Sequence, residues 1–185
     1  IGAVSSYEGH RVQLSKTSLA RRAASIVEYA LRKYAAIKIS LFCSRQEIYH
    51  YTIKDFDEKT SGGKCYNSIQ QLSASGRNKD GYSIRIATSE LRARRESKKV
   101  LVLLSDGLPS DYDGGKAAGM EDVRIAVKEA RRKGIIVIPI MFGNSQFRAD
   151  YKDNFDYMYD QFISCDPSQI SNEFQRLFIS LIKKS

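Results

Sequence analysis

A run of five apolar residues, Val100 to Leu104, is the feature that most constrains the fold of this chain. Two lysines precede the run, and Ser105-Asp106-Gly107 ends it. A short apolar run of this kind is typical of a strand that is buried on both faces, as in a parallel sheet. Asp106 would then lie at the carboxyl end of the strand, where open α/β sheets place their ligand sites. A charged group there costs free energy unless it is paired or bound to a cation, although Asp-Gly also forms ordinary turns.

The rest of the chain alternates between helical and strand patterns. We expect helices over 15–35, 82–94 and 121–133 and after Cys165, and strands over 37–42, 48–53 and 135–142, of which the first two are close enough to pair as a hairpin. The alternation predicts an α/β fold with a doubly wound, mostly parallel sheet, flanked by helices and carrying one antiparallel edge strand. With 185 residues and 42% apolar content, residues 1–185 suit a single domain.

Composition narrows the class of protein further. Three widely spaced cysteines and two distant histidines argue against a disulfide framework and against a zinc site. No apolar run is long enough to span a bilayer and no signal peptide is visible, so we expect a cytoplasmic location and no membrane partner. Because the chain begins with Ile rather than Met, we expect it to be a piece of a longer protein.

The formal net charge of +9 is compatible with nucleic acid, an acidic membrane surface or an acidic protein as partner. One basic cluster spans Arg92 to Lys99, and a second is spread from Arg11 to Lys33. A solvated face is the simpler interpretation of both, because neither cluster is expected to carry the interleaved aromatic residues of a single-strand binder. Tyr34, beside the second cluster, is expected on the apolar stripe of the first helix.

Oxygen-bearing side chains occur in three segments that we expect at the carboxyl edge of the sheet. The apolar opening over residues 1–4 is long enough only for the end of a first strand. The side chains occur in the loop after this strand, in the turn before the helix at 82, and in the loop after the central strand: Ser5, Ser6, Asn78, Asp80, Asp106, Asp111 and Asp113. Hard oxygen ligands suit Mg²⁺, and also Mn²⁺ or Ca²⁺. Each residue type also has an ordinary role, since Asn and Asp cap helices and make turns, and serines occupy loops.

Two segments carry a specific resemblance. Val100–Gly107 resembles the fourth-strand motif of von Willebrand factor A domains, and Gly134–Gly143 resembles the next strand of those domains. Asn78–Arg85 and Ser105–Asp113 are similar to the branch that contains the T subunit of cobalt chelatase and the nitric-oxide-reductase activation proteins. The similarity is clear from about Asn78 to Gly143. It implies a Rossmann-like fold for the whole chain.

The resemblance also implies a metal-ion-dependent adhesion site. Such a site takes ligands from a D-x-S-x-S motif after the first strand, a Thr in a second loop and an Asp after the fourth strand. Asp106 matches the last ligand, and Asn78 or Asp80 stands near the place of the Thr. The first motif departs, because Gly2 and Val4 fall where its aspartate and first serine belong. Two interpretations stay open: the site is degenerate, or residues are missing between Val4 and Ser5.

The sequence therefore favours a non-enzymatic protein-binding module. It would hold a partner carboxylate through Mg²⁺, with Asp111 and Asp113 at the partner face. The resemblance implies an AAA+ ATPase of the chelatase or MoxR type as partner, in metal insertion or metalloenzyme activation. A basic nucleic-acid-binding domain is the alternative. A Mg²⁺-dependent hydrolase using Asp106 is less favoured, because no nucleophile and base are paired with that residue.

Overall fold

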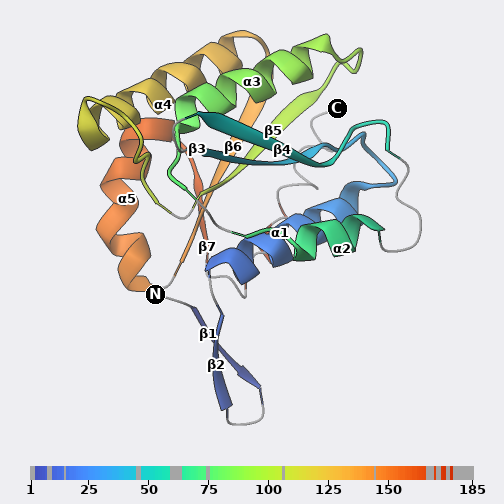
Figure 1. Cartoon of the computed structure of the whole chain (residues 1–185), viewed down its shortest axis with the longest axis vertical. Helices are drawn as coiled ribbons and strands as arrows, with labels where there is room; N and C mark the ends of the chain where they lie inside the picture. Colours follow the sequence, from blue (N-terminus) through green and yellow to red (C-terminus); the bar gives the residue numbers. More distant parts are fainter. Residues whose placement is uncertain are drawn as a thin grey trace. The chain divides into compact units, whose positions relative to one another are not determined.

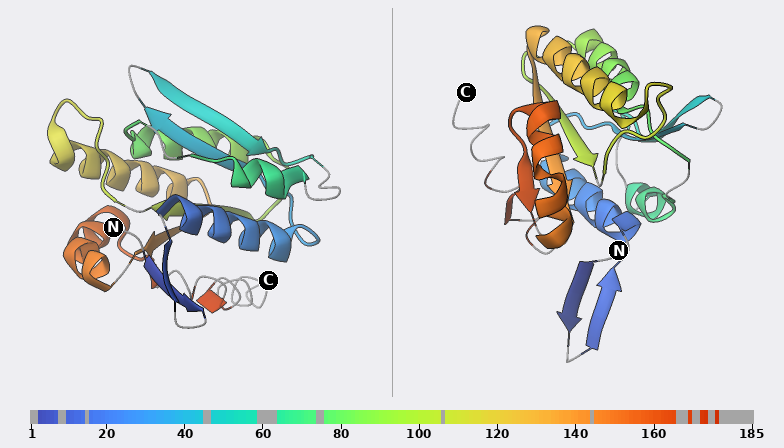
Figure 2. Two further views of the ribbon diagram at one scale, coloured as in Figure 1. Left: turned by 60° about the horizontal axis from the view of Figure 1, so that its bottom comes forward. Right: turned by 90° about the vertical axis from the view of Figure 1, so that its left-hand side faces the viewer.

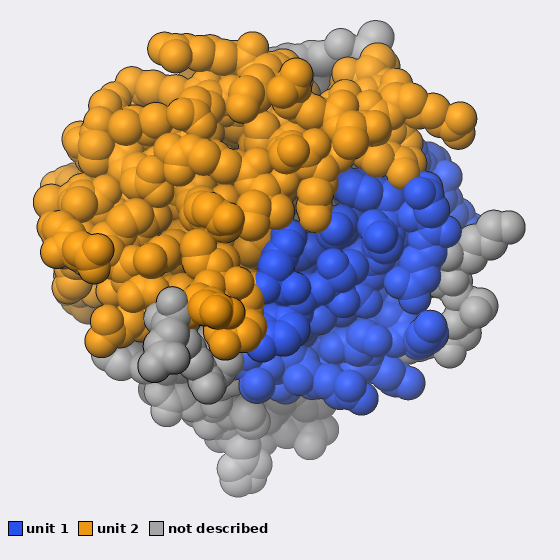
Figure 3. Space-filling view, turned by 45° about the horizontal axis from the view of Figure 1, so that its top comes forward, with its two compact units in different colours: residues 1–41, 50–75, 165–185 blue, residues 42–49, 76–164 orange. Residues whose placement is uncertain are grey.

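The computed structural model of the chain describes residues 3–7, 10–14, 16–44, 47–58, 64–73, 76–105, 107–143, 145–165, 169, 172–173 and 176 (Figure 1). The chain divides into two compact units. Unit 1 comprises Ile1–Leu41, His50–Ser75 and Cys165–Ser185, and unit 2 comprises Phe42–Tyr49 and Gly76–Ser164 (Figure 3). That residues 1–185 form one domain stays a prediction.

A three-stranded sheet with the order β5-β6-β7 contains both apolar runs of the sequence. β5 (Lys99–Ser105) and β6 (Ile135–Phe142) are parallel, with Lys99 opposite Ile135 and Ser105 opposite Met141. β7 (Ile163–Cys165) is the other neighbour of β6. Parallel strands that are connected through a helix confirm the predicted α/β class. The sequence did not predict β7, because three residues are too few to show a periodic pattern.

Three helices of unit 2 pack around this sheet. α3 (Asp80–Ala93) and α4 (Gly115–Arg132) lie side by side, and α4 also contacts β6 and α5 (Ser145–Tyr159) (Figures 1 and 2). The core of the unit consists of apolar side chains from all of these elements: Ile84, Val123, Ala126, Val127, Ala130, Ile135, Val137, Met141, Phe155, Met158 and Tyr159. Burying one large apolar side chain contributes about 1.5–3 kcal/mol, so this cluster holds the helices on the sheet.

α4 begins at Gly115, whereas the sequence predicted a helix only from residue 121. The glycines between residues 107 and 119 read as a loop, but Gly119 is buried inside the helix. A Cβ atom at Gly119 would lie 2.8 Å from Tyr112 Cδ2 and 2.9 Å from Pro109 Cγ. Glycine is therefore required here by close packing of the helix against the preceding loop, and not by a turn.

Unit 1 contains α1 (Lys16–Leu31), α2 (Lys64–Gln70) and a small apolar cluster between them. The cluster comprises buried and half-buried side chains: Ala24, Cys65 and Ile69, with Ile39, Ile53 and Leu72 packed against them. The side chain of Lys54 is buried with 4% exposure, and its Nζ donates to the carbonyl of Ile37 at 3.1 Å. β3 (Ile39–Ser44) and β4 (Ile48–Lys54) form the predicted two-stranded pair.

The first residues of the chain form a hairpin. β1 (Ala3–Tyr7) pairs antiparallel with β2 (His10–Leu14) in a sheet of their own. The sequence predicted only the end of a strand over 1–4, followed by a loop with Ser5 and Ser6, because the apolar opening is four residues long. Pairing with the alternating segment His10–Leu14 instead extends the strand through both serines. The helix predicted after Cys165 falls largely outside the described residues, and Cys165 itself lies in β7.

Candidate functional site

The loop before α3 and the loop after β5 are joined by hydrogen bonds in unit 2. The side-chain oxygen of Asn78 accepts hydrogen bonds from Ser110 N at 3.0 Å and Ser110 Oγ at 2.6 Å. The backbone carbonyl of Asn78 accepts two more, from Ser110 N and Asp111 N, each at 3.2 Å. Asn78 N donates in turn to Ser110 Oγ at 3.4 Å. These contacts hold together two loops that are 32 residues apart in the sequence.

The amide group of Asn78 also fixes Asp80. Its Nδ2 donates to both carboxylate oxygens of Asp80, at 3.0 and 2.9 Å. Neither residue caps the helix as the sequence predicted, because Asp80 is the first residue of α3 and Lys79 is its N-cap, with no side-chain cap hydrogen bond. An acidic side chain in the first turn is nevertheless favourable beside the positive end of the helix dipole.

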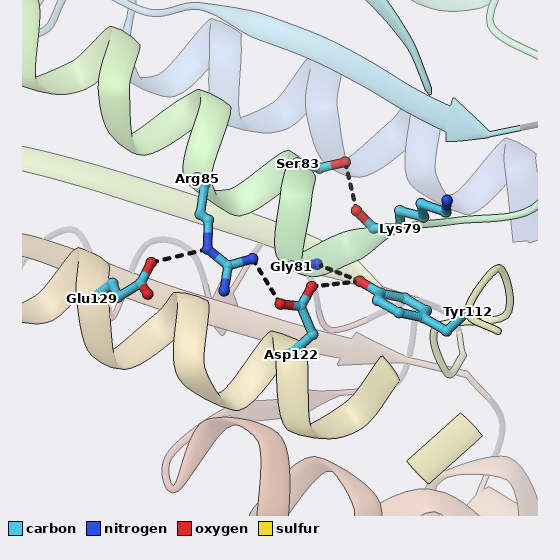
Figure 4. A network of polar contacts seen from close by, with 7 residues as sticks. All are labelled: Lys79, Gly81, Ser83, Arg85, Tyr112, Asp122 and Glu129. Carbon is cyan, nitrogen blue, oxygen red and sulfur yellow. Dashed lines mark hydrogen bonds and ion pairs between the residues drawn. The ribbon is translucent and has the colours of Figure 1, made fainter. Parts of the chain in front are cut away.

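A second set of contacts joins the loop after β5 to both α3 and α4 (Figure 4). The hydroxyl of Tyr112 donates to Asp122 Oδ2 at 2.8 Å and accepts from the backbone N–H of Gly81 at 3.2 Å. Arg85 on α3 donates to Asp122 Oδ1 at 2.7 Å and, through Nε, to Glu129 Oε2 at 2.9 Å. We call Gly81, Arg85, Tyr112, Asp122 and Glu129 the clasp.

The surroundings of Tyr112 and Arg85 favour the protonated form of both side chains. Burial raises the pKa of the Tyr112 hydroxyl above its ordinary value, and the hydrogen bond to Asp122 raises it further. The hydroxyl therefore stays protonated at neutral pH and donates a hydrogen bond to the carboxylate of Asp122. For Arg85, burial lowers the pKa, but hydrogen bonds to Asp122 and Glu129 outweigh it and leave the pKa raised. Hydrogen bonds between charged groups are about twice as strong as neutral ones.

Gly81 lets the two helices approach at the clasp. A Cβ atom at this position would overlap the carboxylate of Asp122, with Cγ at 2.6 Å. The first turn of α3 also carries a contact of its own, since Ser83 Oγ donates to the carbonyl of Lys79 at 3.2 Å (Figure 4). The absence of a side chain at residue 81 therefore decides how closely α3 packs on α4.

The structure brings some of the predicted site residues together. Asn78 and Asp111 lie in the joined loops, and Asp80, held by Asn78, begins α3. Asp111 Oδ1 is 3.8 Å from Arg77 Nη1. The side chain of Asp111 is only 16% exposed, so its role in the loop is structural as well as electrostatic. Asp113 is exposed in the turn before α4.

The other predicted ligands are Ser5, Ser6 and Asp106. Ser5 and Ser6 are interior residues of β1, opposite Val12 and Arg11, and not loop residues as predicted. The strand continues past both serines because it pairs with β2. Asp106 lies outside the described residues, so its role stays a prediction.

Of the predicted ligands beside the joined loops, Asp80 is suited to bind a cation and Asn78 is not. The carboxylate of Asp80 is a hard oxygen donor suited to Mg²⁺. The side-chain oxygen of Asn78 does not fit, because Ser110 N and Oγ already occupy its two acceptor positions. Within the described part of the chain, no three His, Cys, Asp or Glu side chains are grouped as a metal would require.

Sequence reasoning missed the clasp. Arg85 and Tyr112 had been noted only as members of the segments Asn78–Arg85 and Ser105–Asp113, which carry the family resemblance. One feature of the sequence could have indicated the clasp. Asp122 and Glu129 are seven residues apart, which places two carboxylates on one face of α4. Their partner on α3 could not be chosen from the sequence, because many cations are available in this chain.

Comparison with known proteins agrees with this architecture. The structure is a Rossmann-like α/β fold, and residues 25–168 match the von Willebrand factor type A domain. The chain belongs to the von Willebrand factor type A domain family. The membership predicted from the strand and loop motifs is thereby confirmed.

Relatives by sequence include two bacterial proteins. The chain is 34% identical to protein YojO of Bacillus subtilis (strain 168) over 120 residues, which is 64% of this chain and 19% of that protein. It is 40% identical to protein NorD of Brucella suis biovar 1 (strain 1330) over 91 residues, which is 48% of this chain and 14% of that protein. The NorD relatives agree with the predicted branch. The chain thus matches less than a fifth of the length of these two relatives.

Relatives by structure include the von Willebrand factor domain of the type V pili tip protein Mfa5 from Porphyromonas gingivalis. It has a TM-score of 0.65 at 12% identity, covering 91% of this chain and 89% of that one. Proximal thread matrix protein 1 from the mussel byssus, with a zinc-occupied MIDAS motif, has a TM-score of 0.57 at 17% identity and covers 85% of this chain and 38% of its own. At these identities the likeness establishes the fold alone. None of the helices among the described residues has the length and apolar character of a membrane span.

Proposed function

We propose that this chain is a protein-binding module without catalytic activity, which presents the joined loops at Asn78 and Ser110 to a partner. The observation that carries the proposal is the double attachment of these loops, to each other through Asn78 and to two helices through the clasp. A binding surface that is held in one arrangement loses little conformational entropy when a partner binds.

The proposal extends to an AAA+ ATPase of the chelatase or MoxR type as the partner, in metal insertion or the activation of a metalloenzyme. It is supported by the NorD relatives and by the resemblance of the two loop segments to the cobalt-chelatase and nitric-oxide-reductase activation branch. The only hydroxyl in the Asn78–Ser110 contact is hydrogen-bonded to an amide and not to a base, which favours binding over nucleophilic catalysis.

We further propose that Asp106 and Asp80 supply carboxylates for a Mg²⁺ ion, with Mn²⁺ and Ca²⁺ as ions of the same ligand chemistry. When bound, such an ion would offer an open position to a carboxylate of the partner. The tight hydrogen bonds of Asn78 favour a role in holding the loop rather than in direct coordination. The free, buried cysteines Cys43 and Cys65 support a reducing and hence cytoplasmic location.

The test is a binding titration of the chain against the purified MoxR-type ATPase of the same genome, with Mg²⁺ and with EDTA. We expect saturable binding that is about tenfold weaker or more for Asp106→Ala. The matched control is Asp153→Ala, which removes an exposed carboxylate from α5. Equal binding by the wild type and Asp106→Ala would reject the metal site, and no binding under any condition would reject the ATPase as partner.

A further inference from the structure

The outer side of α1 carries an unusually one-sided charge. Residues 16–38 contain six cationic residues and a single acidic one, Glu28. Glu28 is buried, with 7% exposure, whereas Arg22, Arg32 and Lys33 are exposed. The exposed charge of α1 and the turn that follows it is therefore entirely positive among the described side chains.

Two tyrosines lie among these cations. Tyr29 is 70% exposed and Tyr34 is 74% exposed, which is more than any other large apolar or aromatic side chain that the structure describes. The guanidinium carbon of Arg32 lies 4.6 Å from the centre of the Tyr29 ring. The sequence prediction that this cluster lacks interleaved aromatic residues is wrong. Tyr34 was placed on the apolar stripe, but α1 ends at Leu31 and the turn directs Tyr34 outward.

Both tyrosine rings stay largely exposed although α1 packs within unit 1. The inner side of α1 contacts α2 through Ala24, Cys65 and Ile69. Arg22 and Tyr29 are seven residues apart, so they share one side of the helix, and Ala24 is on another. Exposed aromatic rings with a guanidinium over one of them form a surface to which flat, anionic ligands are complementary.

We propose that this surface, which we call the α1 face and define as Arg22, Tyr29, Arg32, Lys33 and Tyr34, binds single-stranded nucleic acid. Bases would stack on Tyr29 and Tyr34, and phosphates would contact Arg22, Arg32 and Lys33. Single-strand binders combine positive charge along the backbone with stacking on aromatic side chains, and they do so with little sequence preference. An acidic protein would need the cations but not two exposed rings, so the tyrosines favour nucleic acid.

Fluorescence anisotropy of the full chain with a dye-labelled oligothymidylate of about 20 nucleotides tests the proposal. We expect binding at low salt that weakens as salt rises, with a slope of log K against log salt near −2 for three phosphate contacts. Replacing Arg22, Arg32 and Lys33 by Gln removes this slope. The double variant Tyr29→Ala, Tyr34→Ala weakens binding by about tenfold or more and leaves the slope in place.

Matched controls remove the same groups from unit 2. Arg92→Gln, Arg95→Gln and Lys133→Gln delete three exposed cations, and Tyr82→Ala deletes a half-exposed tyrosine of α3. Both control variants should bind as the wild type does. The proposal is overturned by an absence of binding at low salt, by equal losses in the controls, or by an unchanged affinity in the tyrosine variant. The last result would indicate a merely electrostatic surface, to which polyglutamate would bind equally well.

Discussion

The hydroxyl of Tyr112 and the carboxylate of Asp122 lie 2.8 Å apart, and this hydrogen bond connects the loop after β5 to α4. The same hydroxyl accepts the backbone N–H of Gly81, so the loop is also connected to the first turn of α3. One phenol group therefore connects three elements: the loop after β5, α3 and α4. Its loss affects both stability and the arrangement of the loops.

Tyr112→Phe tests the weight of this hydroxyl. The variant keeps the ring but leaves the Gly81 N–H and one oxygen of Asp122 without their partner, which costs about 1–3 kcal/mol of unfolding free energy. Urea denaturation followed by circular dichroism measures the loss. Tyr82→Phe, which changes an exposed tyrosine of α3, should lose nothing measurable. Equal free energies of unfolding for Tyr112→Phe and the wild type would show that the Tyr112 hydroxyl does not contribute to stability.

The same pair of proteins tests the pKa of Tyr112. Because burial raises the pKa of Tyr112 in the folded state above its unfolded value, its contribution is fully present below about pH 10. The contribution is lost as pH rises from there through the folded-state pKa. The difference in unfolding free energy between wild type and Tyr112→Phe should therefore shrink in alkaline solution. A difference that stays constant up to alkaline unfolding would contradict the raised pKa.

Gly81→Ala tests the close approach of α3 and α4. Alanine favours a helix interior by about 1 kcal/mol over glycine. At residue 81, however, the added methyl group would overlap the carboxylate of Asp122 and push the two helices apart. We expect a net loss of about 1–3 kcal/mol, the usual range for overpacking. Gly107→Ala is the control, since its Cβ would meet nothing within 4 Å. A stabilised Gly81→Ala would refute the proposed overlap.

Local sequence patterns were sufficient to predict much of the fold, but they predicted little of the candidate site. β5 and β6 were predicted because continuous apolar runs are typical of strands in a parallel sheet, and α3 because its inward residues repeat with helical spacing. The expected burial of β5 on both faces was wrong, since its residues are only partly buried. The hairpin of β1 and β2 was missed because it depends on pairing between two segments that are weak strands alone. The Asn78–Ser110 contact and the clasp connect residues 10 to 44 positions apart. Such contacts are decided by how the helices pack, which no local pattern encodes.

The pKa of Glu121 tests how the stability of the fold depends on pH in acidic solution. Hydrogen bonds from Arg124 and then from Tyr157 lower the pKa of Glu121 from 4.5 to about 2. Its contribution to stability is therefore present above pH 4.5 and is lost as pH falls toward 2. Carboxyl NMR titration should show Arg124→Gln moving the pKa of Glu121 toward 4.5. Arg132→Gln, an exposed cation of the same helix, should leave it lowered. A wild-type pKa of 4.5 would contradict the contact.

Asn78→Ala separates a structural role of this residue from direct coordination of a metal. If Asn78 holds the loops together, Asn78→Ala and Ser110→Ala both remove the hydrogen bond from Ser110 Oγ to Asn78 Oδ1, and their losses in unfolding free energy are not additive. We expect a coupling of about 0.5–3 kcal/mol in the double-mutant cycle. Calorimetric Mg²⁺ titration should then change similarly in both single variants, because each loosens the same pair of loops. A Mg²⁺ affinity that falls about tenfold in Asn78→Ala but is unchanged in Ser110→Ala would contradict a role in holding the loops alone. That result would assign Asn78 either to the ion itself or to the orientation of Asp80, because Asn78 Nδ2 donates to both carboxylate oxygens of Asp80.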